Sequence, residues 1–383
     1  MVYFYKLNNM KNYFHIAHSC KGKEKMKRIV VFLCISLVSM SFLLSKGMKE
    51  NKTSPEDIPV LSEQQNKKMS VGNTASGLPL LTKDTIKIGF IYPEKITNHG
   101  FVYSHELGRL ALEQEGYATE KRENVANNTD VDKALIDLIE DGCNVIYATS
   151  KSYESHIHLL AKQFPQIYFN VMRGEIPEKN VSCYDPLMYE AMYLAGIAAG
   201  GITVSNKIGI IAPFPTTGND LKFLFFTNGV ASYNKNAQCF GIYINDWTDD
   251  MAEREATNTL IDAGCDIIVN YTRGLGPLQQ AEERGVRVIG IGTDDSSFAP
   301  QFSLCSALYN FTRIYPLEVS TILAGTWTGT LKNYGLAQGG VGLNTLSLCP
   351  EEVKSAIERA KKDMIENKIQ LHSSDLNVEL KEL

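Results

Sequence analysis

Two short stretches of the chain nearly repeat one another: "KIGFIYP" at residues 87–93 and "KIGIIAP" at residues 207–213. Their β-branched and aromatic residues are typical of a buried strand. Two longer pairs keep almost the same spacing: "LIEDGCNVIYATS" (138–150) recurs as "LIDAGCDIIVNYT" (260–272), and "PQIYFNV" (165–171) aligns with "VRVIGIG" (286–292). Three matched pairs at nearly one offset indicate two similar units in series.

Within each unit, strand-like runs alternate with helical patterns. Alternation of this length predicts a parallel sheet that helices cover on both faces. The expected fold is therefore α/β, with two doubly wound, Rossmann-like lobes. In the first helix we expect Tyr103, Leu107, Leu110 and Ala111 to face the core and His105, Glu106, Arg109 and Glu113 to face outward.

The N-terminal region predicts export or anchoring. A basic run, "KGKEKMKR" at residues 21–28, directly precedes the uncharged apolar run "IVVFLCISLVSMSFLL" at residues 29–44. This order is typical of a signal peptide or a membrane anchor, and the length of the apolar run leaves both open. Met26 is an alternative start of the chain. The sequence lacks the lipoprotein signal, because Cys34 lies inside the apolar run.

The expected domain organisation combines this region with the two lobes. Residues 1–45 hold the basic segment and the signal peptide or membrane anchor, and the polar residues 46–83 form a flexible linker. The N-terminal lobe is expected to comprise residues 84–185 and 301–332. The C-terminal lobe is expected to comprise residues 186–300 and 333–383.

Composition and cysteine spacing exclude several classes of function. The 383 residues carry a formal net charge of -5, and the body of the chain has no cluster of lysine and arginine. A nucleic-acid partner is therefore not expected, because phosphate binding uses such clusters. The eight cysteines form no C-x-x-C pair and have no histidine at metal-ligand spacing, which predicts buried free thiols and no metal site.

The candidate ligand site lies where the strands end, because doubly wound sheets bind ligands at their carboxyl edge. Amides, hydroxyls, carboxylates and aromatic rings are expected there, which suits a flat, uncharged ligand with a polar rim. The arginine of "IIVNYTRG" (267–274) adds a positive charge and keeps a charged or phosphorylated ligand open. The candidate ligand-binding residues are Asn98, His99, Phe101, Thr149, Ser150, Phe226, Trp247, Tyr271, Arg273 and Asp294.

Catalytic motifs are missing from the sequence. It has no G-x-x-x-x-G-K-[ST], no G-x-S-x-G and no H-E-x-x-H, and "GLGPLQ" (274–279) lacks the third glycine of a dinucleotide site. His99 and His105 share no acid or metal partner, and Asp294 and Asp295 are adjacent and point different ways. Neither an enzyme nor a bound cofactor is therefore expected.

Five motifs are informative when taken together: "HGFVYSHELGR" (99–109), "YEAMYLAGIAAG" (189–200), "WTDDMAEREATNTLIDAGCDII" (247–268), "GTDDSSFAP" (292–300) and "LAGTWTG" (323–329). Together they resemble the basic membrane protein (BMP) family of ABC-transporter substrate-binding proteins, which is related to purine nucleoside receptors. The resemblance runs from about residue 86 to near residue 368. It implies a type I periplasmic-binding-protein fold, in which two lobes joined by a three-strand hinge close around a ligand.

The resemblance also implies a purine nucleobase or nucleoside as the ligand. Phe101 would stack on the base, where one branch of the family usually has tryptophan, and Asn98 would lie at its edge, where many relatives have aspartate. Tyr271 and Arg273 depart from the family pattern of histidine and small polar residues. By position, Phe226 and Trp247 would line the second lobe, Asp294 would be the ligand-binding carboxylate, and Thr149 and Ser150 match the family's Thr–Ser strand end.

The expected function is that of an extracytoplasmic solute-binding protein. It would capture a purine-type ligand between its lobes for an ABC permease and its ATPase, either anchored at the outer face of the membrane or secreted. The alternative is a membrane-anchored ligand sensor or regulatory protein that uses the same clamp without transport. A DNA-binding regulator is disfavoured, because no helix-turn-helix precedes residue 86 and the chain is acidic. A hydrolase or dehydrogenase is a more distant alternative.

Overall fold

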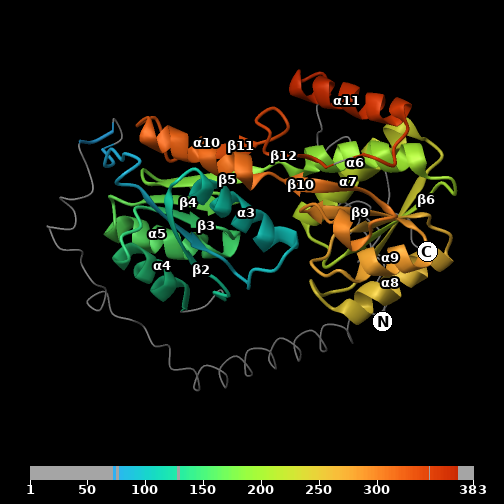
Figure 1. Cartoon of the computed structure of the whole chain (residues 1–383), viewed down its shortest axis with the longest axis horizontal. Helices are drawn as coiled ribbons and strands as arrows, with labels where there is room; N and C mark the ends of the chain where they lie inside the picture. Colours follow the sequence, from blue (N-terminus) through green and yellow to red (C-terminus); the bar gives the residue numbers. More distant parts are fainter. Residues whose placement is uncertain (1–71, 75–76, 127–129, 345, 370–383) are drawn as a thin grey trace, which may run out of the picture. The chain divides into compact units, whose positions relative to one another are not determined.

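The computed structural model describes residues 72–74, 77–126, 130–344 and 346–369. The predicted basic run and apolar run, and the linker as far as residue 71, lie outside these residues. In the part described, no helix combines the length and apolar character needed to cross a bilayer. Two six-stranded sheets organise the described residues (Figure 1).

The first sheet has the strand order β11-β5-β4-β3-β1-β2, and all its pairings are parallel. Helices α3 and α10 pack together on one face, and α4 and α5 cover the other (Figure 1). Burial on both faces explains why the central strands β1, β3 and β4 are nearly continuous apolar runs. The elements are β1 (Lys87–Ile91), α3 (Gly100–Gln114), β2 (Ala118–Arg122), α4 (Asp130–Glu140), β3 (Val145–Ala148), a 3-10 turn (Lys151–Tyr153), α5 (Glu154–Gln163), β4 (Tyr168–Met172), β5 (Val181–Pro186), α10 (Phe311–Leu323) and β11 (Leu331–Tyr334).

The second sheet repeats this arrangement with the order β12-β10-β9-β8-β6-β7. Lys87 and Lys207 begin the equivalent strands β1 and β6, so the predicted internal repeat is confirmed. The edge strand differs, because β12 pairs antiparallel with β10. The elements are α6 (Met188–Ile202), β6 (Lys207–Ala212), α7 (Thr217–Tyr233), β7 (Gln238–Tyr243), α8 (Asp250–Asp262), β8 (Ile267–Asn270), α9 (Gly276–Arg284), β9 (Arg287–Gly292), a 3-10 turn (Ser296–Phe298), β10 (Ser303–Tyr309), β12 (Val341–Leu343) and α11 (Glu351–Ile365).

One predicted lobe boundary is wrong. We expected residues 301–332 in the N-terminal lobe, but β10 extends the second sheet, where it pairs with β9 and β12. Its sequence continues the parallel register of β9, with Ala307 opposite Ile291, and the chain returns to the first lobe only at α10.

The described chain passes between the sheets three times, after β5, after β10 and after β11. Hydrogen bonds tie these crossings together: the Leu187 amide donates to the Tyr334 carbonyl (3.1 Å), and the Asn310 amide donates to the Gly340 carbonyl (2.9 Å). Three adjacent crossings form a hinge about which two lobes can close.

Glycines allow α6 and α7 to pack closely in the second lobe. A Cβ on Gly196 would lie 2.1 Å from the Phe226 carbonyl oxygen, and one on Gly229 would lie 2.0 Å from the Tyr193 carbonyl oxygen. No side chain larger than hydrogen fits at these distances. This close packing places the Phe226 side chain, which is fully buried, in the core of the second lobe.

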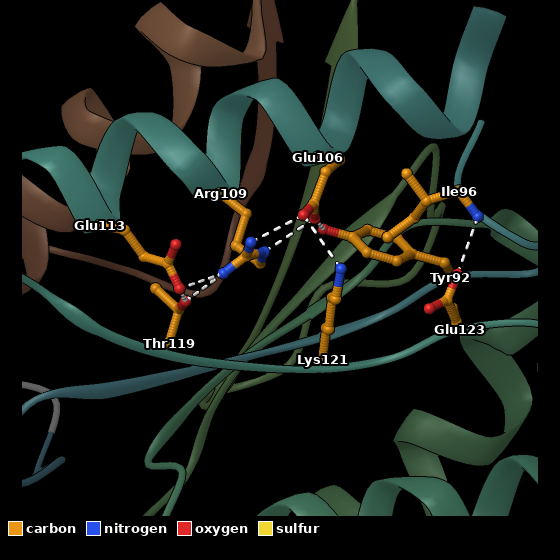
Figure 2. A network of polar contacts seen from close by, with 8 residues as sticks. All are labelled: Tyr92, Ile96, Glu106, Arg109, Glu113, Thr119, Lys121 and Glu123. Atoms are coloured by element: carbon orange, nitrogen blue, oxygen red, sulfur yellow. Dashed lines mark hydrogen bonds and ion pairs between the residues drawn. The ribbon is translucent and has the colours of Figure 1, made fainter. Parts of the chain in front are cut away.

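The predicted outward face of α3 is also wrong, because His105, Glu106 and Arg109 are buried. Glu106 accepts hydrogen bonds from the Tyr92 hydroxyl (3.0 Å) and from Arg109 Nε and Nη2 (both 2.7 Å), as Figure 2 shows. Burial opposes ionisation of Glu106, but Arg109 and Lys121 outweigh it and lower the pKa of the carboxyl. This face of α3 can be buried because the charges of Glu106, Arg109 and Lys121 neutralise one another.

Candidate ligand-binding site

The turn between β1 and α3 is held from both lobes. On its own side, the Ile96 amide donates to Glu123 Oε2 (2.9 Å; Figure 2). The helix then begins at Gly100, whose φ of +76° is a conformation that only glycine adopts readily. From the other lobe, the carbonyl of Arg273 contacts His99 Nε2 at 3.1 Å. A carbonyl can only accept, so Nε2 carries the hydrogen.

Two further contacts join the lobes beside this turn. The Gly100 amide donates to Thr293 Oγ1 (2.9 Å), and the Arg273 guanidinium forms an ion pair with Glu94. Burial lowers the pKa of His99, so the imidazole is neutral at physiological pH and its contact needs no counter-charge. The structure therefore describes the two lobes closed against each other at this edge.

A cavity of about 200 Å³ lies between the strand ends of the two sheets. Its volume is below the roughly 300–1,000 Å³ of pockets for drug-sized ligands, so it suits a ligand of about one heterocycle. The first lobe contributes Gly100, Phe101, Ser150, Lys151, Met172 and Arg173. The second lobe contributes Trp247, Tyr271, Thr272, Arg273, Ile291, Gly292 and Tyr309.

Aromatic rings form opposite parts of the lining. Phe101 meets the ring of Tyr309 edge-on at 5.7 Å between centroids. On the second lobe, the Arg273 guanidinium lies 4.4 Å from the centre of the Trp247 ring, within cation–π range. Rings from both lobes can therefore contact one flat ligand.

Arg173 is fixed between the cavity and the hinge. Its backbone has a φ of 55°, and its amide donates to the Tyr184 carbonyl (2.8 Å). The side chain reaches Asp185 (Nε to Oδ1, 3.2 Å) and donates from Nη2 to the Tyr309 hydroxyl (2.7 Å). These contacts hold the guanidinium in one place at the edge of the cavity.

Five of the ten predicted site residues line this cavity: Phe101, Ser150, Trp247, Tyr271 and Arg273. His99 lies next to it and positions the turn instead. Asn98 is exposed, with Oδ1 3.1 Å from His99 Nδ1. Contact with the ligand stays a prediction for all seven of these residues.

The other three predicted residues lie away from the lining. Thr149 is buried and donates to the Ile91 carbonyl (2.7 Å), so it joins two strands. Phe226 belongs to the core of the second lobe. Asp294 is exposed and accepts hydrogen bonds from the Ser296 amide (3.0 Å) and Asn344 Nδ2 (2.8 Å). Its hydrogen bonds close a loop of the second lobe.

Three lining residues are not among the predicted site residues: Lys151, Arg173 and Tyr309. Arg173 directly follows a predicted strand, so its position was the available signal. Tyr309 was missed because its strand was assigned to the other lobe. The six described cysteines are buried free thiols, as predicted. Among the described residues, no group of three or more His, Cys, Asp or Glu side chains is placed to hold a metal ion.

Comparisons with known proteins show which family the chain belongs to. The family model of PnrA-like ABC transporter substrate-binding proteins (Bmp) matches residues 85–375. The chain belongs to the Bmp family. The resemblance predicted from the motifs is therefore confirmed, and with it the membership in a family of solute-binding components that work with ABC transporters.

Individual Bmp relatives and neighbours differ in their described roles. The chain is 28% identical to the purine-binding protein BAB2_0673 of Brucella abortus over 77% of this chain and 83% of that protein. It is 24% identical to the transcriptional activator protein med of Bacillus subtilis over 68% of this chain and 82% of that protein. A solved ABC transporter solute-binding protein from Conexibacter woesei superposes with a TM-score of 0.68 at 18% identity, over 75% of this chain and 98% of that one. The last similarity shows the two-lobe, type I solute-binding fold, which confirms the predicted fold class.

Proposed function

We propose that this protein captures a purine-type heterocycle between its two lobes and presents the closed form to an ABC permease and its ATPase. One observation carries the proposal: Phe101 and Trp247, from different lobes, line one cavity of about 200 Å³. Stacking of a base on an aromatic side chain contributes on the order of 1–3 kcal/mol. The similarity to a Brucella purine-binding protein supports the same ligand class.

Closure is the proposed mechanism of capture. A ligand that touches Phe101 and Trp247 at once contacts both lobes only in the closed form, and such differential contact shifts the population toward closure. The contacts of His99, Gly100 and Thr293 then complete the closed edge. We place this activity outside the cytoplasm, at the outer face of the membrane, with the 29–44 segment either retained as an anchor or removed.

The test is calorimetric titration of the purified full-length chain with adenine, guanine and their nucleosides, together with mass spectrometry of small molecules released on denaturation. Phe101→Ala should weaken binding about tenfold or more. Phe302→Ala removes a ring that lies near Arg287 in the second lobe and outside the cavity lining, so it should leave affinity unchanged. Absence of any bound heterocycle and of any heat with these ligands would sink the purine assignment.

The second candidate is a membrane-anchored sensor or regulator that binds the same ligand without transport. The similarity to the Bacillus subtilis transcriptional activator protein med favours it. Uptake of a radiolabelled purine by cells lacking this protein separates the two. Reduced uptake supports the importer component, and unchanged uptake with intact binding supports the sensor.

A further inference from the structure

The cavity is lined by three cationic side chains, Lys151, Arg173 and Arg273. No aspartate or glutamate is among the described residues of the lining. A neutral heterocycle would leave three charged groups facing it without gaining from their charge. This imbalance is the feature of the site that a plain purine does not explain.

The carboxylates that pair with these cations lie outside the lining. Arg173 reaches Asp185 at 3.2 Å, Arg273 pairs with Glu94, and Lys151 pairs with Glu175. Glu94 and Glu175 are substantially exposed, so solvent screens those two pairs strongly. The two arginine pairs use Nε of Arg173 and Nη1 of Arg273, and Arg173 Nη2 donates to the Tyr309 hydroxyl. The remaining guanidinium N–H groups are the donors for an anionic ligand.

A buried lysine lies behind the lining. Lys222 is buried and donates from Nζ to the Tyr271 hydroxyl (2.5 Å), and Tyr271 lines the cavity. None of the ion pairs found among the described residues includes Lys222. Burial, and then the charge of Arg173, lowers the pKa of Lys222, whereas the charge of Asp185 opposes this shift.

We infer that the ligand is a flat heterocycle of about one purine ring system that carries negative charge, an ionised oxopurine such as urate. This inference rests on the proposed function and narrows its ligand class. The aromatic rings contact the faces of the ligand, while Arg173 and Arg273 donate to its anionic oxygens from the two lobes. Charge-assisted hydrogen bonds of this kind are about twice as strong as neutral ones. The small cavity disfavours a ribose and a phosphate on the same ligand.

The test compares urate, which is an anion at neutral pH, with hypoxanthine, which is neutral and of nearly the same shape. Calorimetric titration of the full-length wild-type protein at neutral pH should give an affinity for urate about tenfold or more above that for hypoxanthine. Arg173→Gln should remove most of this preference, because it lowers the affinity for urate more than the affinity for hypoxanthine. Arg287→Gln is the matched control, because Arg287 also lies near an aromatic ring, that of Phe302, outside the cavity.

Each outcome decides between named alternatives. Hypoxanthine or adenine binding as tightly as urate overturns the anionic ligand and leaves the proposed function standing. Adenosine monophosphate binding more tightly than urate overturns the size limit of one ring system, and inorganic phosphate binding more tightly than urate overturns the flat heterocycle. Binding of no purine overturns both proposals. The wild-type comparison alone decides the matter if Arg173→Gln does not fold.

Discussion

The backbone amide of Gly100 donates a 2.9 Å hydrogen bond to the hydroxyl of Thr293, which belongs to the other lobe. The same hydroxyl donates to Asp295 Oδ1 (2.9 Å), so its hydrogen points into the second lobe and its lone pair toward Gly100. The buried Asp295 carboxyl thus orients the Thr293 hydroxyl. This hydroxyl in turn holds the first residue of α3, Gly100, against the second lobe.

Thr293→Val should weaken ligand binding by roughly 0.5–1.5 kcal/mol, the usual net value of one hydrogen bond. Valine keeps the shape but cannot accept from the Gly100 amide, so the closed form loses a contact that the open form never made. Isothermal titration measures the change. Thr203→Val is the control, because Thr203 donates to Asp266 (2.7 Å) within the second lobe and contacts no cavity residue in the described structure. Equal affinities in both variants would show that this contact does not bias closure.

Phe226→Ala should lower the free energy of unfolding by about 3–5 kcal/mol, as expected for a large buried ring. Phe226 belongs to α7 and is fully buried, and the close packing of its backbone against Gly196 of α6 leaves little room for the helices to relax into the space. Urea unfolding measures the loss, and titration of the remaining folded protein should show unchanged affinity. The reverse pattern, a small change in stability with lost binding, would return Phe226 to the ligand site.

Glu106→Gln should destabilise the protein by about 3–5 kcal/mol, because it removes the only buried carboxylate that pairs with Arg109 in the described structure and leaves the exposed Glu113. Chemical denaturation measures this. Asp250→Asn is the control, because it removes the carboxylate of an exposed ion pair with Arg254, one turn further along α8. It should lower the free energy of unfolding by about 1 kcal/mol or less. Similar costs for both variants would contradict the view that α3 buries a neutralised charge network.

The two-lobe fold was predictable because its signal is repeated. Parallel strands that are buried on both faces have sequences that are apolar runs. Matched stretches such as those starting at Lys87 and Lys207 identify equivalent strands without any knowledge of contacts. The strand-end rule likewise found Phe101, Trp247 and Arg273, because position after a strand is visible in the sequence. These features depend on local order along the chain.

The predictions that were wrong concern features that depend on contacts between residues far apart in the sequence. Charged residues such as Glu106 and Arg109 are expected at the surface. Their burial is stable only because they pair with each other and because Tyr92 and Lys121 donate to Glu106. Phe226 follows a plausible site segment, yet the glycines of α6 bring its helix into the core. The predicted lobe boundary near Tyr309 was wrong because the sequence "SLCSALY" (303–309) is compatible with a strand of either sheet. Its pairing with β9 places it in the second sheet.

Asp295 should make stability fall as pH rises. Burial raises the pKa of its carboxyl from 3.8 to about 7, despite the hydrogen bond from Thr293. Between about pH 4 and pH 7 the folded protein therefore keeps a proton that the unfolded chain has released, so this group's contribution is full below pH 4 and is lost by about pH 7. A pKa change of this size corresponds to on the order of 4 kcal/mol.

Asp295→Asn removes that titration, so the stability of the variant relative to wild type should rise between about pH 4 and pH 7. Urea unfolding at a series of pH values gives the difference curve. Asp294→Asn is the control: burial opposes ionisation of Asp294, but hydrogen bonds from Ser296 and Asn344 outweigh it and lower the pKa of the carboxyl. Asp294 is then ionised in both states above about pH 5, so its difference curve should be much flatter there, with only the contribution from the lost Asp294 charge beside Asp295. A flat curve for Asp295→Asn would mean that solvent reaches the carboxyl, and that Thr293 is not oriented by a buried group.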